Sequence, residues 1–266
     1  MSNFRERFVT ADDFRIRYLE AGQGRSVETP VVHLHGAGGL MLTPAHGLLS
    51  RSFRMIVLEM PGFGTSAENT SARTMSELAD TIATAIGALG LDRVHLMGTS
   101  FGAKVALWTA VRHPAVIQTL VLEGPAAIRL PGMVPPSGTP EEIARRLYAH
   151  PERVPPLPPL DPAVAAKQRA LVNRVRGPDR DADLEARMRE LPTPTLVVFG
   201  TRDDVIAPAV GRIYKELMPD AHLGFIYDAG HEAAMERPEA FAEIVTDFLL
   251  RRDAFVISRG RTVLFP

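Results

Sequence analysis

Apolar runs and amphipathic stretches alternate along this chain. Continuous apolar runs, which are typical of buried strands, begin near residues 31, 55, 94 and 119, and again near 195 and 223. Apolar positions at helical spacing predict helices over 75–89, 103–112, 209–218 and 237–251. Strands that alternate with helices favour a mainly parallel sheet covered by helices on both faces, which is an α/β architecture.

The first 21 residues follow a different pattern. Residues 4–10 and 14–21 alternate apolar and polar side chains on either side of Asp12 and Asp13. Alternation with a period of two around a turn predicts an antiparallel hairpin, which we expect at an edge of the sheet.

The chain changes character over residues 125–191. Prolines are frequent in its first half, most densely over 155–160, and amphipathic helical stretches follow at 140–148, 162–176 and 181–190. The proline run has two interpretations, a stiff extended connector or a polyproline ligand for a partner domain. The connector is favoured because nothing beside the run has the composition of a disordered segment.

The sequence Gly98-Thr99-Ser100-Phe101-Gly102 lies between a predicted strand and a predicted helix. Gly-x-Ser-x-Gly in this position is the nucleophile elbow, a tight turn that exposes the serine hydroxyl. The pattern arises by chance in about one chain in ten of this length. Only its position relative to other motifs can therefore show whether Ser100 is a nucleophile.

Three further pieces each follow a predicted strand, in the order that a Ser-Asp-His triad requires. They are His35-Gly36-Ala37-Gly38-Gly39, the pair Asp203-Asp204 after Gly200, and Ala229-Gly230-His231. With the segment from Glu59 to Ser66, and Glu236 and Pro238 after His231, the sequence resembles the α/β-hydrolase superfamily over residues 4–124 and 192–250. The resemblance implies an α/β-hydrolase core (1–124 and 192–253), a helical cap over the catalytic pocket (125–191) and a C-terminal tail (254–266).

The resemblance also implies the role of each site residue. Ser100 is expected to be the nucleophile rather than a helix-capping serine, and His231 the base rather than a turn residue. Asp203 is the expected acid, from its spacing after Gly200. Asp204 is an alternative because Pro208 follows it by four positions, and Glu123 is another because some relatives take their acid from the end of that strand.

Backbone N–H groups are expected to form the oxyanion hole. The two donors are those of Phe101, which follows the nucleophile, and Ala37, which follows His35 and Gly36. His35 is expected to support this loop by hydrogen bonding, and His33 to be a buried core residue. Lys104 is expected to be solvated or paired with a carboxylate.

The serine excludes the dehalogenases and epoxide hydrolases of this fold, which use aspartate. A carboxylic ester of a small to medium, mostly apolar substrate is the expected target, cleaved through an acyl-enzyme on Ser100. One alternative is a hydrolase that cleaves a C–C bond of ring-fission products, although those enzymes often carry Asn and Trp where Thr99 and Glu232 stand here. The other is a ligand receptor without catalysis.

Composition narrows the expected partners and compartment. The formal net charge of −1 gives no electrostatic reason to expect nucleic acid or a membrane. With no cysteine and no His-Glu-x-x-His motif, no cofactor or metal is expected. The N-terminus lacks the apolar region of a signal peptide, so a cytoplasmic location is expected. The apolar tail, residues 254–266, is expected to pack on the cap or on a second copy in a homo-oligomer.

Overall fold

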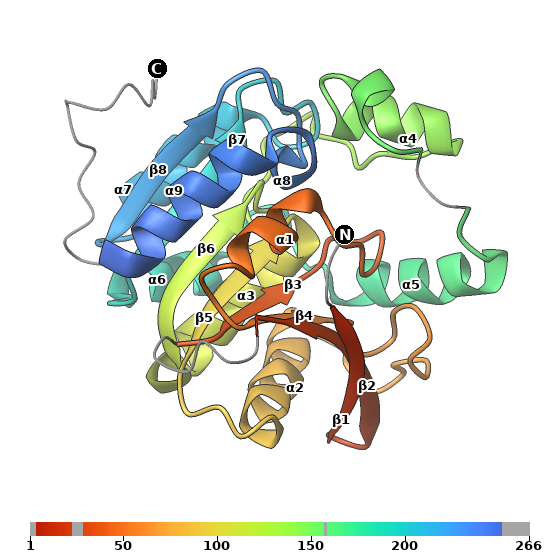
Figure 1. The fold of residues 1–266 in the computed structure, drawn as a ribbon, viewed down its shortest axis with the longest axis vertical. Helices are drawn as coiled ribbons and strands as arrows, with labels where there is room; N and C mark the ends of the chain where they lie inside the picture. Colours follow the sequence, from red (N-terminus) through yellow and green to blue (C-terminus); the bar gives the residue numbers. More distant parts are fainter. Residues whose placement is uncertain (1–3, 23–28, 157–158, 252–266) are drawn as a thin grey trace.

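The computed structural model describes residues 4–22, 29–156 and 159–251, and the tail at 254–266 lies outside them. Within these residues one sheet holds strands in the order β1-β2-β4-β3-β5-β6-β7-β8 (Figure 1). Their bounds are β1 Arg5–Ala11, β2 Phe14–Ala21, β3 Val31–Leu34, β4 Met55–Leu58, β5 Val94–Thr99, β6 Ile117–Glu123, β7 Thr195–Gly200 and β8 Ala221–Ile226.

Neighbouring strands from β4 through β8 run parallel, whereas β2 lies antiparallel to β4 and β1 pairs with β2 as the edge hairpin. Asp12 and Asp13 turn this hairpin with positive φ angles of 46° and 66°. Aspartate tolerates this left-handed conformation better than most residues. The predicted α/β class, the mainly parallel sheet and the N-terminal hairpin are confirmed.

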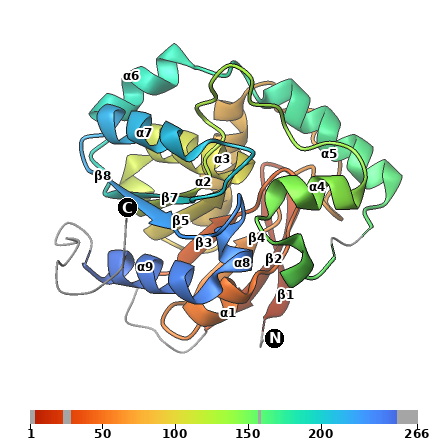
Figure 2. The same ribbon diagram turned by 90° about the horizontal axis from the view of Figure 1, so that it is seen from above.

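Helices cover both faces of the sheet (Figures 1 and 2). The core helices are α1 Pro44–Leu49, α2 Met75–Ala88, α3 Phe101–Arg112, α7 Gly211–Leu217, α8 Ala233–Glu236 and α9 Pro238–Arg251, with short 3₁₀ turns η1 Pro114–Val116 and η3 Pro208–Val210. The helices α2, α3 and α7 share one apolar core with one face, and α1, α8 and α9 share a second core with the other. The short helices α1 and α8 were not predicted, because six and four residues are too few to establish a helical period.

Residues 125–191 do not form one layer. Their elements are α4 Pro140–Leu147, η2 Pro151–Arg153, α5 Pro162–Val175 and α6 Ala182–Glu190. The helix α6 lies beside α7 on a face of the sheet and buries Leu184 and Met188 in the larger core (Figure 2). The helices α4 and α5 instead lie outside this layer, at the edge where the parallel strands end (Figure 1). In the described part of the chain, no helix has the length and apolar character needed to cross a membrane.

Candidate active site

Four of the predicted site residues lie where parallel strands end. Ser100 follows β5, Glu123 is the last residue of β6, Asp203 follows β7 and His231 follows β8. Because β5, β6, β7 and β8 are parallel neighbours in that order, their carboxyl ends meet at one edge. Segments far apart in sequence are therefore brought together at the position where open α/β sheets bind ligands.

The turn at Ser100 is strained and closely packed. Ser100 has φ 54° and ψ −112°, a backbone conformation that a residue with a side chain rarely adopts. A Cβ atom added to Gly98 would lie 2.5 Å from the Gly102 carbonyl oxygen, and one added to Gly102 would overlap the Leu34 carbonyl. Both glycines are therefore required by the close approach of β5, α3 and the end of β3, and this packing holds Ser100 at the tip of the turn.

Asp203 and His231 form a buried pair. His231 Nδ1 lies 2.8 Å from Asp203 Oδ2. The other carboxylate oxygen accepts the backbone N–H groups of Val205 at 2.8 Å and Ile206 at 2.9 Å, which fixes the carboxylate. Burial lowers the pKa of His231, but the carboxylates of Asp203, Glu232 and Glu123 together outweigh burial, and the pKa lies above its ordinary value. The buried Nε2 on the opposite side of the ring has no hydrogen-bond partner among the described residues.

The two alternative acids lie elsewhere. Asp204 is 71% exposed and forms an ion pair with Arg146 at 2.7 Å. Glu123 is buried and accepts hydrogen bonds from the Thr99 hydroxyl at 2.6 Å and the Ala234 N–H at 2.8 Å. Of the three carboxylates, the structure places Asp203 in direct contact with the imidazole.

The two expected oxyanion donors lie in register. Leu34 of β3 pairs with Gly98 of β5, and Ala37 and Phe101 each lie three residues beyond that pair. A Cβ atom on Gly36 would lie 3.7 Å from the Ser100 Cβ, so the glycine-rich turn passes directly beside the serine. Both backbone segments therefore lie beside Ser100, where an oxyanion would form.

His35 holds the glycine-rich turn in place. Its Nδ1 donates to the Gly36 carbonyl at 2.7 Å, and its Nε2 accepts the Met60 N–H at 3.0 Å. One tautomer satisfies both bonds, and burial lowers the pKa of His35 to about 4, so the ring is neutral. This agrees with the supporting role expected from the sequence.

The prediction that Lys104 is solvated or paired with a carboxylate is wrong. It is buried, and its ammonium donates to the carbonyl oxygens of Arg176 at 2.5 Å and Pro178 at 3.4 Å. Burial lowers the pKa of Lys104 to about 8. The prediction failed because sequence pattern does not reveal that residues 176–178 cover the first turn of α3.

Gln168 of α5 is a site residue that sequence reasoning missed. It is buried, accepts the Gly64 N–H at 3.0 Å and donates to the Gly38 carbonyl at 3.4 Å, so it contacts the glycine-rich turn directly. No local signal could have found it, because 130 positions separate Gln168 from Gly38.

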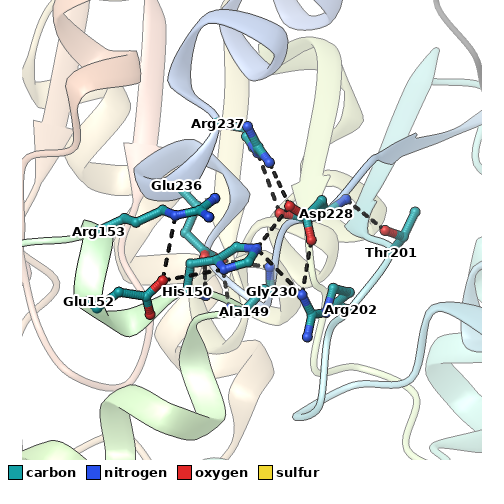
Figure 3. Close-up of polar contacts among 10 residues, drawn as sticks. All are labelled: Ala149, His150, Glu152, Arg153, Thr201, Arg202, Asp228, Gly230, Glu236 and Arg237. Carbon is teal, nitrogen blue, oxygen red and sulfur yellow. Dashed lines mark hydrogen bonds and ion pairs between the residues drawn. The ribbon is translucent and has the colours of Figure 1, made fainter.

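The end of α4 contacts the turn that carries His231. The His231 N–H donates to the Leu147 carbonyl at 2.7 Å. The Glu236 carboxylate accepts the N–H groups of Gly230 at 2.6 Å, Ala149 at 3.1 Å and His150 at 2.8 Å (Figure 3). One carboxylate thus joins residues 149–150 to the histidine turn.

Asp228 forms a second junction beside the first. Its side chain lies among Arg237 at 2.7 Å, Arg202 at 3.0 Å and His150 at 2.8 Å (Figure 3). Hydrogen bonds from His150 and Arg202 hold the pKa of Asp228 well below its ordinary value. Asp228 has a positive φ of 55° and lies in the turn after β8.

Across the described ranges, no cluster of three His, Cys, Asp or Glu side chains is arranged to hold a metal ion.

Comparison with known proteins shows the family. Residues 31–244 match the model of the alpha/beta hydrolase family, and the chain belongs to that family. It is 29% identical to 2-hydroxy-6-oxo-6-(2'-aminophenyl)hexa-2,4-dienoic acid hydrolase of Metapseudomonas resinovorans, over 94% of this chain and 93% of that one. It is 28% identical to 2-hydroxymuconate semialdehyde hydrolase of Pseudomonas sp. (strain CF600), over 95% and 96% of the two chains.

A solved structure with the same fold is that of a serine hydrolase involved in carbazole degradation. It is 27% identical to this chain, with a TM-score of 0.75, and the match covers 94% of this chain and 100% of that one.

Proposed function

We propose that this protein is a serine hydrolase that cleaves a C–C bond in a 2-hydroxy-6-oxo-dienoate, the product of aromatic ring fission. The observation that carries the proposal is the buried pair of His231 and Asp203, at the same sheet edge as the strained turn of Ser100. The choice of bond follows the curated relatives above, whose names describe hydrolases of such dienoates and of 2-hydroxymuconate semialdehyde. The relatives thus favour the C–C alternative over the ester that we first expected.

The first step is attack by Ser100 on the carbonyl carbon C6 of the substrate. His231 Nε2 accepts the hydroxyl proton, and Asp203 stabilises the imidazolium that forms. The developing oxyanion accepts hydrogen bonds from the N–H groups of Ala37 and Phe101.

The second step breaks the bond between C5 and C6. The substrate reacts as its keto tautomer, in which the proton of the 2-hydroxyl group has moved to C5 and the double bond lies between C3 and C4. The electron pair of the C5–C6 bond moves onto C5 and is delocalised through the C3–C4 double bond into the 2-oxo group. The His231 imidazolium returns its proton to the dienolate, which leaves as a dienoate. Water, activated by His231, then attacks the acyl-serine, releases the carboxylic acid and restores the hydroxyl of Ser100.

Residues 125–191 are proposed to form a cap that selects the substrate. Two contacts support this role: α5 contacts the glycine-rich turn through Gln168, and the end of α4 contacts the histidine turn through Leu147. Both turns lie at the sheet edge that carries Ser100, so this segment is placed to contact a substrate bound there.

An ester remains a second candidate, and Glu232 favours it. The residue after the histidine, often Trp in C–C hydrolases, is here a carboxylate that accepts a hydrogen bond from the Tyr148 hydroxyl at 3.0 Å. Burial raises the pKa of Glu232, and in its charged form the carboxylate opposes binding of an anionic dienoate but leaves a neutral ester unaffected.

The test compares both substrates with one enzyme preparation. We would measure kcat/KM for 2-hydroxy-6-oxo-6-phenylhexa-2,4-dienoate, from the loss of its visible absorbance, and for p-nitrophenyl esters from acetate to dodecanoate. The proposal expects a kcat/KM at least about tenfold higher for the dienoate, with both activities absent in Ser100→Ala. Esters as the better substrates would establish the second candidate, and turnover that survives in Ser100→Ala would refute both.

A further inference from the structure

A chain of buried polar side chains runs behind the nucleophile. The Thr43 N–H donates to His46 Nδ1 at 2.9 Å, and His46 Nε2 lies 2.9 Å from His33 Nδ1. His33 Nε2 lies 3.0 Å from the Thr99 hydroxyl, which lies 2.6 Å from Glu123 Oε2. The side chains from His46 to Glu123 are buried, and they connect α1 with β6 across β3 and β5.

The direction of every hydrogen bond in this chain follows from its first donor. A backbone N–H can only donate, so His46 Nδ1 carries no proton and His46 Nε2 is the donor to His33 Nδ1. His33 must then carry its proton on Nε2 and donate to Thr99, whose own proton is directed to the carboxylate. Burial lowers the pKa of both histidines, and both rings are neutral as this assignment requires.

Glu123 contacts the backbone of both segments that carry the proposed reactive side chains. Its Oε1 accepts the N–H of Ala234, three residues after His231, and its backbone carbonyl accepts the N–H of Ser100 at 2.8 Å. A Cβ atom on the next residue, Gly124, would lie 2.9 Å from His231 Nδ1, so this backbone packs against the imidazole.

A carboxylate in this position costs stability. Burial raises the pKa of Glu123 to about 7, and the donated hydrogen bonds and the nearby His231 oppose the rise. Both carboxylate oxygens receive donors, which favours the charged form. A buried charge that is destabilising and yet held by an ordered chain of donors suggests a role in function.

We infer that Glu123 is a positioning residue that stabilises the positively charged form of His231, and that the chain from His46 through His33 and Thr99 holds its carboxylate for this purpose. The inference rests on the proposed role of His231 as the base of a serine hydrolase. It differs from a role as the triad acid, because Asp203 occupies that contact.

Glu123 does not act on His231 alone. Asp203 contacts the ring directly, and the part-buried Glu232 is the next residue along the chain and is bound by the Tyr148 hydroxyl from the end of α4. These two carboxylates remain when Glu123 is neutralised. We therefore expect a partial decrease in the pKa of His231 rather than a return to the value of a free histidine.

The experiment is an NMR titration of the His231 ring in the full-length protein. The signal is assigned by its absence in His231→Asn, and its pKa is compared between the wild type, Glu123→Gln and Thr99→Val. We expect both variants to lower the pKa of His231 by at least about half a pH unit, since each removes or destabilises the negative charge. If Glu123→Gln does not fold, the comparison of Thr99→Val with the wild type still tests the inference.

The matched control is Thr119→Val. Thr119 is a buried threonine on β6 whose hydroxyl lies 2.7 Å from His95 Nδ1 on β5, at the opposite end of these strands. Like Thr99→Val, the control variant removes a buried threonine hydroxyl from the same sheet. We expect the pKa of His231 to stay unchanged in it. An unchanged pKa in the Glu123 and Thr99 variants would overturn the inference, as would an equal shift in Thr119→Val.

This readout separates the inference from the proposed function. The titration requires no turnover, so a failure to hydrolyse any tested dienoate or ester leaves its result intact. Where turnover is found, the acid limb of kcat/KM should move to lower pH in Glu123→Gln. A lower rate with an unmoved limb would show a merely structural role and would also overturn the inference.

Discussion

The sheet edge that carries Ser100, Asp203 and His231 and the adjoining residues 125–191 are held in place by different means. At the edge, backbone lies against backbone: Gly98 and Gly102 admit no side chain, and strands β3, β5 and β7 beneath them are buried throughout. Over α5 and residues 176–178, the segment 125–191 is held in addition by side chains that donate to main-chain carbonyls, and residues 147–150 are held by backbone groups and the Glu236 carboxylate.

Some of these donor side chains lie on residues 125–191, and others lie on the core helix α3. Lys167 of α5 donates to the carbonyls of Gly64 and Ser66, Arg174 to those of Ala72 and Asn69, and Lys104 of α3 to those of Arg176 and Pro178. A bond to a carbonyl oxygen is insensitive to the identity of the residue that supplies the carbonyl. These contacts therefore depend on Lys167, Arg174 and Lys104, and not on the side chains of the residues whose carbonyls they bind.

The largest expected effect is at the edge. Replacing Ser100 by alanine removes the nucleophile and should lower turnover about 10⁶-fold, the size of the loss in a comparable triad. The measurement is steady-state turnover of the better of the two substrate classes. The apolar anchors of α5 are untouched, so an unchanged melting temperature should accompany the loss.

Variants of the two neighbouring aspartates, Asp203 and Asp204, test which carboxylate acts on His231. Asp203→Asn should lower turnover about 10⁴-fold, because the amide no longer stabilises the imidazolium. Asp204→Asn removes only an exposed partner of Arg146 and should change turnover less than twofold. Equal losses in the two variants would contradict the assignment of Asp203.

A pH-dependent stability effect should also lie at the edge. The pKa of Glu123 is raised from 4.5 to about 7 in the folded protein, so the folded state binds the proton more tightly than the unfolded state. Stability from this group is complete below pH 4.5 and is lost as the pH rises through 7, a decrease of roughly 3 kcal/mol.

Glu123→Gln does not titrate and should lack this loss. The difference in unfolding free energy, wild type minus variant, should therefore fall between pH 4 and pH 8 in urea denaturation. A constant difference over that range would show that Glu123 keeps an ordinary pKa.

The smallest expected effect is at the junction of the two regions. Gln168→Leu removes the contacts to Gly38 and Gly64 and should lower kcat/KM about tenfold, because the glycine-rich turn loses a support. Arg169→Ala, at the exposed neighbouring position, is the control and should stay within twofold. A control as impaired as Gln168→Leu would mean that α5 acts as a whole rather than through this contact.

The sequence was informative wherever chemistry depends on a short local motif. The glycines around Ser100 and the strand before His231 place both residues at the sheet edge, because parallel strands must end there together. Asp203 and Asp204 are adjacent, and only the fold shows which one contacts the histidine.

The remaining features depend on contacts between distant segments. Gln168, the burial of Lys104 and the chain from His46 to Glu123 each join elements dozens of residues apart. Local propensity and periodicity carry no information about such pairs. The packing of α6 within the core layer is likewise a contact between distant segments that composition does not reveal, and the extent of the cap stays a prediction.

The most direct test of the triad is active-site labelling with a fluorophosphonate, read by intact mass and peptide mapping. The account expects a single label on Ser100 of the wild type, and labelling slowed at least about 10³-fold in His231→Asn, because the hydroxyl then lacks its base. A label on another residue, or an unchanged rate in His231→Asn, would contradict it.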